Sequence, residues 1–135
     1  MPALPWRTFR PPRRGDEYLV LLSELPLKSY TALPRFLRFV VQITRQLASA
    51  PGLIGYSLFA RLGSKQFWTL SVWEDEDTLM AFVDAAPHRT AMPALRPIMG
   101  ETQFIRWAIR GNSYPPIWNE AFARATSPPF SGMPP

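Results

Sequence analysis

The sequence predicts an α+β domain of the ferredoxin-like class, in which a four-stranded antiparallel sheet carries two helices on one face. Two observations predict this class. The first is the order in which strand-like and helix-like segments follow one another between residues 16 and 110, which is β-α-β-β-α-β. The second is the length of 135 residues, which suits one domain with its own hydrophobic core.

The first two elements are a buried strand and an amphipathic helix. The run Tyr18–Leu25 is short, almost continuously apolar and followed by Pro26, which indicates a central strand. Beyond it, apolar side chains recur at helical spacing, at Phe36, Phe39, Val40, Ile43 and Leu47. Polar side chains occupy the other side, at Arg38, Gln42, Arg45 and Gln46. Because Pro34 suits a first helical turn, we predict a helix from there to the stop sequence at residues 50–52.

The middle of the chain predicts a β-hairpin. Residues 53–62 and 66–74 are rich in strand-forming side chains, and Gly63–Lys65 supplies the turn. In the second arm, Trp68 shares one face with Leu70 and Val72, and Trp73 shares the other with Phe67, Thr69 and Ser71. Both faces of this strand are largely apolar, so we expect both to be covered.

A second helix and a last strand complete the order. Four carboxylates at residues 74–77 suit a helix start, where they cap exposed N–H groups, and we prefer this interpretation to a cation site. An apolar stripe follows at Leu79, Phe82, Val83 and Ala86. Pro87 interrupts the helix, and residues 88–100 add further helical turns. Residues 102–111 alternate again as a strand, with Arg106 on one face and Trp107 on the other.

The composition divides the chain into three parts. Many of the 16 prolines lie near the two ends, so we predict an N-terminal arm, residues 1–15, the α+β domain, residues 16–110, and a C-terminal extension, residues 111–135. The arm holds four of the 15 basic residues behind the net charge of +5, at Arg7, Arg10, Arg13 and Arg14. No nucleic-acid motif accompanies this charge, and we do not expect nucleic-acid binding. The aromatic side chains of both extensions predict that they pack onto the domain.

Several classes of function are excluded or disfavoured. The chain has no cysteine, so disulfides, thiolate metal sites and cysteine nucleophiles are excluded. No apolar run approaches the roughly 18 residues that a membrane helix needs, and the N-terminus does not resemble a secretory signal. We therefore expect a cytoplasmic protein that does not associate with a membrane. Nucleophile-elbow, phosphate-loop and metal-ligand spacings are also missing from the sequence.

The stretch from Trp73 to His88 resembles the antibiotic biosynthesis monooxygenase-like family of the dimeric α/β-barrel superfamily. Members of that family often have a tryptophan at the end of the third strand, an acidic helix entry and a histidine after a break in the second helix. Trp73, Glu74 and His88 stand at those positions. The resemblance covers about residues 18–109 and implies a barrel-like sheet dimer with a pocket between the sheet and helices of each protomer. Two apolar sheet faces predict the same homodimer, formed through the sheet face that the helices leave open.

What the resemblance implies is cofactor-independent oxidation of a flat, apolar or aromatic small molecule. Residue chemistry permits it, with His88 and Tyr56 as the catalytic base and hydrogen-bonding group. The expected substrate-binding side chains are mostly aromatic: Trp68, Trp73, Phe82, Arg106 and Trp107. His88 is the only histidine, and its alternative role is a local hydrogen bond at a helix start. The chain thus leans towards an oxidoreductase, without being assigned as an enzyme by its sequence.

Two other functions stay open. The chain could be a haem- or small-ligand-binding module without turnover, with His88 as the one available iron ligand, or a non-catalytic dimeric scaffold. Many family members carry a second histidine roughly where Phe82 stands, and haem-degrading relatives place their ligand histidine near the position of Met92. Neither residue is a histidine here, so we do not expect haem degradation. No metal site is expected apart from this possible haem ligand.

Overall fold

The structure, a computed structural model, describes residues 3–126, and residues 1–2 and 127–135 of the two predicted extensions lie outside the described residues. A five-stranded sheet has the order β1-β3-β4-β2-β5, in which each neighbouring pair is antiparallel. Its strands are β1 (Arg7–Thr8), β2 (Glu17–Pro26), β3 (Leu53–Arg61), β4 (Gln66–Trp73) and β5 (Gln103–Arg110). The helices are α1 (Leu33–Ala48), α2 (Glu76–Asp84), α3 (His88–Leu95) and α4 (Trp118–Thr126). Short 3-10 turns lie at Tyr30–Ala32, Leu62–Ser64, Arg96–Ile98 and Gly111–Ser113.

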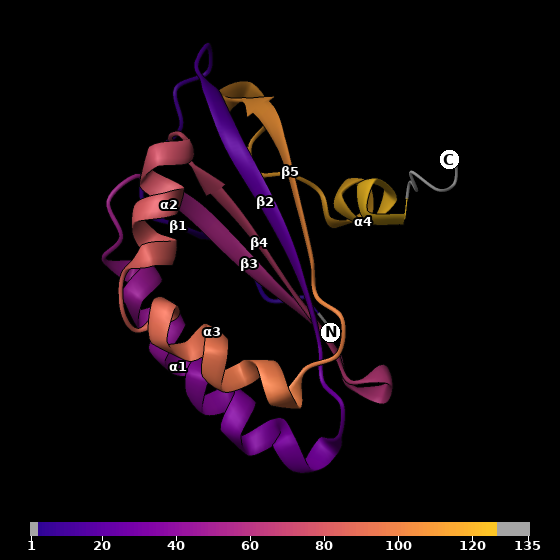
Figure 1. The fold of residues 1–135 in the computed structure, drawn as a ribbon. Coiled ribbons are helices and arrows are strands. Elements are labelled where there is room, and N and C mark those ends of the chain that lie inside the picture. The colour runs from indigo at the N-terminus through magenta and orange to yellow at the C-terminus, as the bar shows by residue number, and fades with distance from the viewer. Residues whose placement is uncertain (1–2, 127–135) are drawn as a thin grey trace.

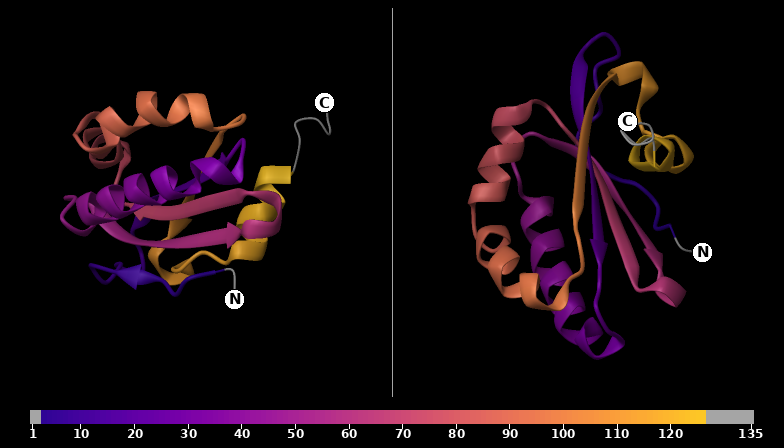
Figure 2. Two further views of the ribbon diagram at one scale, coloured as in Figure 1. Left: turned by 90° about the horizontal axis from the view of Figure 1, so that it is seen from below. Right: turned by 45° about the vertical axis from the view of Figure 1, so that its right-hand side comes forward.

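The predicted ferredoxin-like class is confirmed. Strands β2, β3, β4 and β5 form the predicted antiparallel sheet, and Leu22 at its centre pairs with Leu70 on β4 and with Ile105 on β5. Figures 1 and 2 show α1, α2 and α3 on one face of this sheet and α4 on the opposite face. Among the described residues, no helix is both long and apolar enough to cross a membrane.

The fifth strand corrects the predicted four. Arg7 and Thr8 pair with Tyr56 and Gly55 at the β3 edge, so the N-terminal arm adds a short strand to the sheet. The contact extends beyond the strand, since the N–H of Leu4 donates to the carbonyl of Leu58 at 2.8 Å. The prolines of the arm lack the N–H that a ladder needs. The paired residues lie between the prolines, where every N–H is present.

The predicted second helix is two helices. α2 ends at Asp84 and α3 begins at His88, and Pro87 lies between them. Ala86, which was predicted to continue the apolar stripe of α2, is exposed because the helix ends two residues earlier. The stripe itself is present at Leu79 and Phe82, which are buried against the sheet.

Two separate apolar cores fill the two faces of the sheet. On the helix-covered face, Trp73, Tyr56 and Leu79 belong to one cluster, and Phe36 and Leu95 belong to a second cluster nearby. On the other face, Val20, Leu70 and Val72 are fully buried at 0% exposure, and α4 packs over them through Ala121 and its aromatic side chains. The prediction that both faces are covered is therefore confirmed within a single chain.

Candidate active site

A cavity of about 500 Å³ lies between the sheet and helices α1 to α3. This volume is within the range of sites for small organic molecules. Its sheet side is formed by alternate residues of the strands: Leu21, Ser23, Leu25, Tyr56, Thr69, Ser71, Trp73, Phe104 and Arg106. Its helical side is formed by Ile43, Leu47, Leu79, Met80, Phe82, Val83, His88 and Met92, and residues 96–102 contribute Arg96, Met99, Gly100 and Thr102. The walls are thus mostly apolar, with a few hydroxyl groups, one imidazole and two guanidinium groups.

His88 is the first residue of α3, and its ring lies against Phe82 with the ring centroids 5.1 Å apart. Nδ1 lies 3.2 Å from the carbonyl oxygen of Val83. A carbonyl can only accept, so Nδ1 carries the proton in this bond, and the lone pair of the neutral ring is on Nε2. Burial lowers the pKa of His88 from its usual value of 6.5, and the Val83 hydrogen bond opposes this shift only in part. His88 is therefore arranged as a neutral base.

The Val83 carbonyl is available to His88 because of Pro87. In a continuous helix, the carbonyl of residue 83 would accept from the N–H of residue 87. Proline has no N–H, so this partner is missing. The imidazole takes its place, five residues along the chain. The break between α2 and α3 thus both turns the chain and creates the acceptor that fixes the tautomer of His88.

On the sheet side, Trp73 and Ser71 form a buried polar contact in the cavity wall. The indole Nε1 of Trp73 donates to Oγ of Ser71 at 2.9 Å. Trp73 is 1% exposed and Ser71 is 7% exposed. Tyr56 lies on the adjacent strand β3 and is 5% exposed, with its ring stacked on Phe9 of the N-terminal arm. The cavity thus places Tyr56, Trp73, Phe82 and His88 together, four of the residues predicted from the sequence.

Arg106 lines the same cavity from β5. Its guanidinium forms an ion pair with Glu76 at 3.1 Å, and its side chain is 43% exposed, so it lies where the cavity meets solvent. Such a partly exposed pair contributes little stability. Arg106, expected to bind substrate, thus lies at the cavity with a carboxylate partner and is partly exposed.

Trp68 and Trp107 do not line this cavity. Both lie on the α4 face of the sheet, where Trp68 packs on Phe59 and Phe122 and Trp107 stacks under the guanidinium of Arg124. The reason is the alternation of side chains along a strand: Trp68 is five residues from Trp73, an odd number, so the two must point to opposite faces. The prediction that Trp68 and Trp107 line the cavity is therefore corrected, because both lie on the opposite face of the sheet.

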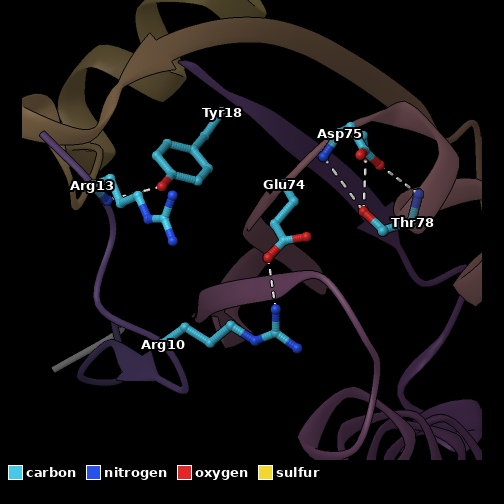
Figure 3. Close-up of polar contacts among 6 residues, drawn as sticks. All are labelled: Arg10, Arg13, Tyr18, Glu74, Asp75 and Thr78. Atoms are coloured by element: carbon cyan, nitrogen blue, oxygen red, sulfur yellow. Dashed lines mark hydrogen bonds and ion pairs between the residues drawn. The ribbon is translucent and has the colours of Figure 1, made fainter. Parts of the chain in front are cut away.

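The acidic start of α2 confirms the capping interpretation of residues 74–77. Oδ1 of Asp75 accepts from the N–H of Thr78 at 2.8 Å, and Oγ1 of Thr78 accepts from the N–H of Asp75, which is a capping box (Figure 3). Glu74 and Glu76 make ion pairs outside the helix, with Arg10 and Arg106. The box fixes the point at which the chain leaves β4 and enters the helix that carries Phe82.

A second, more polar cavity of about 540 Å³ lies under the N-terminal arm. Figure 3 shows two contacts that hold the arm there, the Arg10–Glu74 ion pair and the bond from the N–H of Arg13 to the hydroxyl of Tyr18 at 2.8 Å. Its lining contains Arg10 and Arg13 together with Asp16, Glu17 and Glu74, so its charges are mixed. This cavity has no imidazole and few apolar walls, and the first cavity is the better candidate for chemistry.

One polar residue of the site escaped the sequence prediction. Gln46 was assigned to the solvent side of α1, yet it is half-buried and its amide reaches the junction between α2 and α3. The spacing contained the signal, because Gln46 follows Phe39 by seven residues and Ile43 by three, which are intervals of one helical face. Within residues 3–126, no group of three or more His, Asp or Glu side chains is arranged to hold a metal ion.

The fold and this cavity define a class: a ferredoxin-like α+β protein with a ligand-sized pocket between its sheet and its helices. Residues 31–94 match the profile of the antibiotic biosynthesis monooxygenase family. This segment runs through α1, β3, β4 and α2 into α3, and it contains Trp73, Glu74 and His88. The resemblance predicted from the sequence is confirmed. No curated protein is significantly similar in sequence to this chain.

Solved structures with the same fold share little sequence with the chain. SnoaB, a cofactor-independent oxygenase from Streptomyces nogalater, has a TM-score of 0.58 at 16% identity, over 71% of this chain and 95% of its own. A dimeric ferredoxin-like protein from Thermobifida fusca has a TM-score of 0.59 at 17% identity, over 70% and 92%. A conserved protein from Methanosarcina mazei has a TM-score of 0.61 at 15% identity, over 67% and 90%. At these identities the likeness shows the fold alone.

Proposed function

We propose that the chain is a monooxygenase-like enzyme that oxidises a flat, apolar or aromatic small molecule in the cavity between its sheet and helices, without a bound cofactor. The observation that carries the proposal is the half-buried imidazole of His88, a neutral base at the wall of an apolar cavity of about 500 Å³. The match of residues 31–94 to the monooxygenase family supports the same reaction class.

The proposed reaction begins with proton removal. Nε2 of His88 takes a proton from an acidic C–H or O–H of the substrate, and the substrate becomes an electron-rich carbanion or phenolate. This anion reduces O2 and combines with it to form a peroxide, which takes the proton back. Loss of water from the peroxide leaves a new carbonyl, so one oxygen atom stays in the product and the other leaves as water. The substrate supplies all four electrons.

The residues around His88 suit each step of this reaction. Tyr56 on β3 offers a hydroxyl in the same cavity that can donate to the oxygen on which negative charge develops. Trp73, Phe82 and Leu79 exclude water and present flat surfaces to a flat ligand. Arg106, at the solvent side of the cavity, is placed to contact the polar end of the substrate.

We further propose that the chain forms a homodimer. The Thermobifida fusca structure of the same fold is described as dimeric. The sheet face predicted for the contact is covered by α4 within each chain, so a dimer on this side would be made through α4 and the edge strand β5. Ile117, which directly precedes α4, is 61% exposed. Light scattering after size exclusion tests this, and a monomer of 15.4 kDa would contradict it.

Oxygen consumption with an anthrone tests the proposed reaction. We expect uptake of one O2 per product quinone with the protein as purified from metal-free medium, and a rate lower by about 10² or more in His88→Ala. Unchanged activity in His88→Ala would remove the proposed role of that residue, and absence of uptake in the unmodified protein would refute the oxidation of such substrates.

Haem binding is the competing function, because a histidine whose Nδ1 donates to a carbonyl is also suited to bind iron through Nε2. Haem titration therefore accompanies the oxygen assay. A Soret band that is present in the unmodified protein and lost in His88→Ala, without oxygen uptake on the anthrone, would favour a haem-binding module over the oxygenase.

A further inference from the structure

The junction between α2 and α3 is held by a side chain from α1. The Oε1 atom of Gln46 accepts from the N–H of His88 at 2.9 Å. The Nε2 atom of Gln46 donates to the carbonyl of Phe82 at 3.1 Å and to that of Ala85 at 3.3 Å. One amide group thus bonds to the end of α2, to the residue that follows it and to the start of α3.

Gln46 is the acceptor for the N–H of His88, whereas the carbonyls of Phe82 and Ala85 also accept from the N–H groups of Ala85 at 3.2 Å and Arg89 at 3.0 Å. The last carbonyls of a helix and the first N–H groups of the next have no partner within their own helices. Pro87, at the position before α3, makes no side-chain capping bond to the first N–H groups of that helix. Because a glutamine amide offers an acceptor and two donor hydrogens, it can satisfy both kinds of group at once.

We propose that Gln46 is a positioning residue for the imidazole of His88, which it acts on by fixing the distance between the end of α2 and the start of α3. The inference rests on the proposed function, in which His88 is the base. The ring of His88 is oriented by the Val83 carbonyl, which belongs to α2, whereas its backbone belongs to α3. The Nδ1–Val83 bond persists only while the two helices keep their spacing.

Backbone hydrogen bonds across the break do not join the last turn of α2 to the N–H of His88. The direct backbone contacts across the break are short-range, from the N–H of Arg89 to the carbonyl of Ala85 at 3.0 Å and from Ala91 to Pro87 at 2.8 Å. Neither reaches the carbonyl of Phe82 or the N–H of His88. The amide of Gln46 reaches both, and α1, which carries it, is anchored on the sheet side by Phe36 and Leu47 at 2% and 7% exposure.

The test is the proton position on His88, observed by long-range ¹H–¹⁵N NMR of the imidazole in the full chain without substrate. In the unmodified protein we expect the Nδ1–H tautomer to dominate at pH values where the ring is neutral. In Gln46→Met, which keeps the side-chain length and removes all three hydrogen bonds, we expect a mixture in which the Nε2–H tautomer is at least about as abundant. We also expect kcat to fall about tenfold or more and KM to change less than about threefold.

The matched control is Gln42→Met, the same substitution one helical turn earlier at an exposed position. It should leave the tautomer and kcat unchanged. Gln46→Glu, which keeps the acceptor for His88 and loses the donors to α2, serves as a second variant if Gln46→Met does not fold. It too should shift the tautomer, because the Val83 carbonyl lies in the element that it releases.

The outcomes separate this inference from the proposed function. A wild-type tautomer ratio in a folded Gln46→Met or Gln46→Glu would overturn the positioning role, whatever the activity. A shifted ratio together with unmodified protein that consumes no oxygen would support the positioning role and refute the oxygenase proposal. An equal shift in Gln42→Met would also overturn it, because the effect would not be specific to the contacts of Gln46.

Discussion

The buried hydrogen bond between Trp73 and Ser71 makes a double-mutant cycle possible inside the cavity wall. Nε1 of Trp73 donates to Oγ of Ser71 at 2.9 Å, in a place where water replaces neither partner easily. The perturbations are Ser71→Ala, which removes the acceptor, Trp73→Phe, which removes the donor, and both together.

The expected magnitudes follow from what each change leaves behind. Ser71→Ala leaves a buried indole N–H without its acceptor, which costs about 1–3 kcal/mol of the free energy of unfolding. Trp73→Phe leaves the hydroxyl unpaired and also removes part of a side chain that is 1% exposed, so about 2–4 kcal/mol is expected. In the double variant no polar group is orphaned. It should therefore be less destabilised than the sum of the two by about 1–2 kcal/mol.

Urea unfolding followed by far-ultraviolet circular dichroism measures all four proteins, provided that their m-values agree. Ser57→Ala, on the opposite face of the same sheet, tests whether loss of any buried serine gives the same coupling with Trp73→Phe. Additivity within about 0.3 kcal/mol for the Ser71 pair would refute the reasoning, because it would mean that the bond has no net effect on stability.

Three further predictions concern the pKa of His88, the cap of α2 and the position of α4. Burial lowers the pKa of His88, so the unfolded chain binds this proton more readily, and stability should fall as the pH drops from about 6.5 through the lower folded-state pKa. This loss should be absent in His88→Asn. Equal free energies of unfolding at pH 7.5 and pH 5 in the unmodified protein would contradict the prediction. Asp75→Ala should cost about 1 kcal/mol in thermal or urea unfolding, because it removes the accepting side of the capping box; no change beyond error would show that Thr78 or water replaces it. Trp118→Phe removes the bond from the indole N–H to Oγ of Ser57 at 3.1 Å and should cost about 0.5–1.5 kcal/mol, whereas an unchanged midpoint would mean that α4 is held by ring packing alone.

The sheet and its helices could be predicted because their signals are local. Residues 18–25 and 66–74 have the composition and periodicity of strands, and the observed strands, residues 17–26 and 66–73, differ from them by no more than one residue at any end. The helix near Pro34 begins one residue earlier than this proline. Where periodicity is strong and long, the chain follows it.

The arm and α4 could not be predicted in the same way. Arg7 and Thr8 form a strand only because the edge of β3 has unpaired N–H and carbonyl groups to offer. α4 is nine residues long, and a helix of that length depends on packing against a partner surface, here the face of the sheet. Sequence patterning indicated that the aromatic side chains of this segment pack, and it did not indicate a helix.

The site could be predicted in part, because side chains alternate between the two faces of a strand and because the chain has a single histidine. One cavity is lined by five of the predicted residues: Tyr56, Trp73, Phe82, Arg106 and His88. Trp68 and Trp107 point to the opposite face, as the alternation of side chains along a strand requires. Gln46 needed three-dimensional information, because its partners are backbone groups of residues 82, 85 and 88, which have no sequence signature.

The two-sided sheet has a consequence for how this chain can change over time. Neighbouring residues of β4 are one peptide bond apart and face different surroundings. Thr69, Ser71 and Trp73 line the cavity. Trp68, Leu70 and Val72 lie in the packed core under α4. Substitutions at the odd positions change the wall of the cavity, whereas substitutions at the even positions change the packing under α4. Variation along this strand should therefore have a period of two, because alternate positions meet different surroundings, a pattern that a set of sequences similar to this chain could display without any measurement of activity.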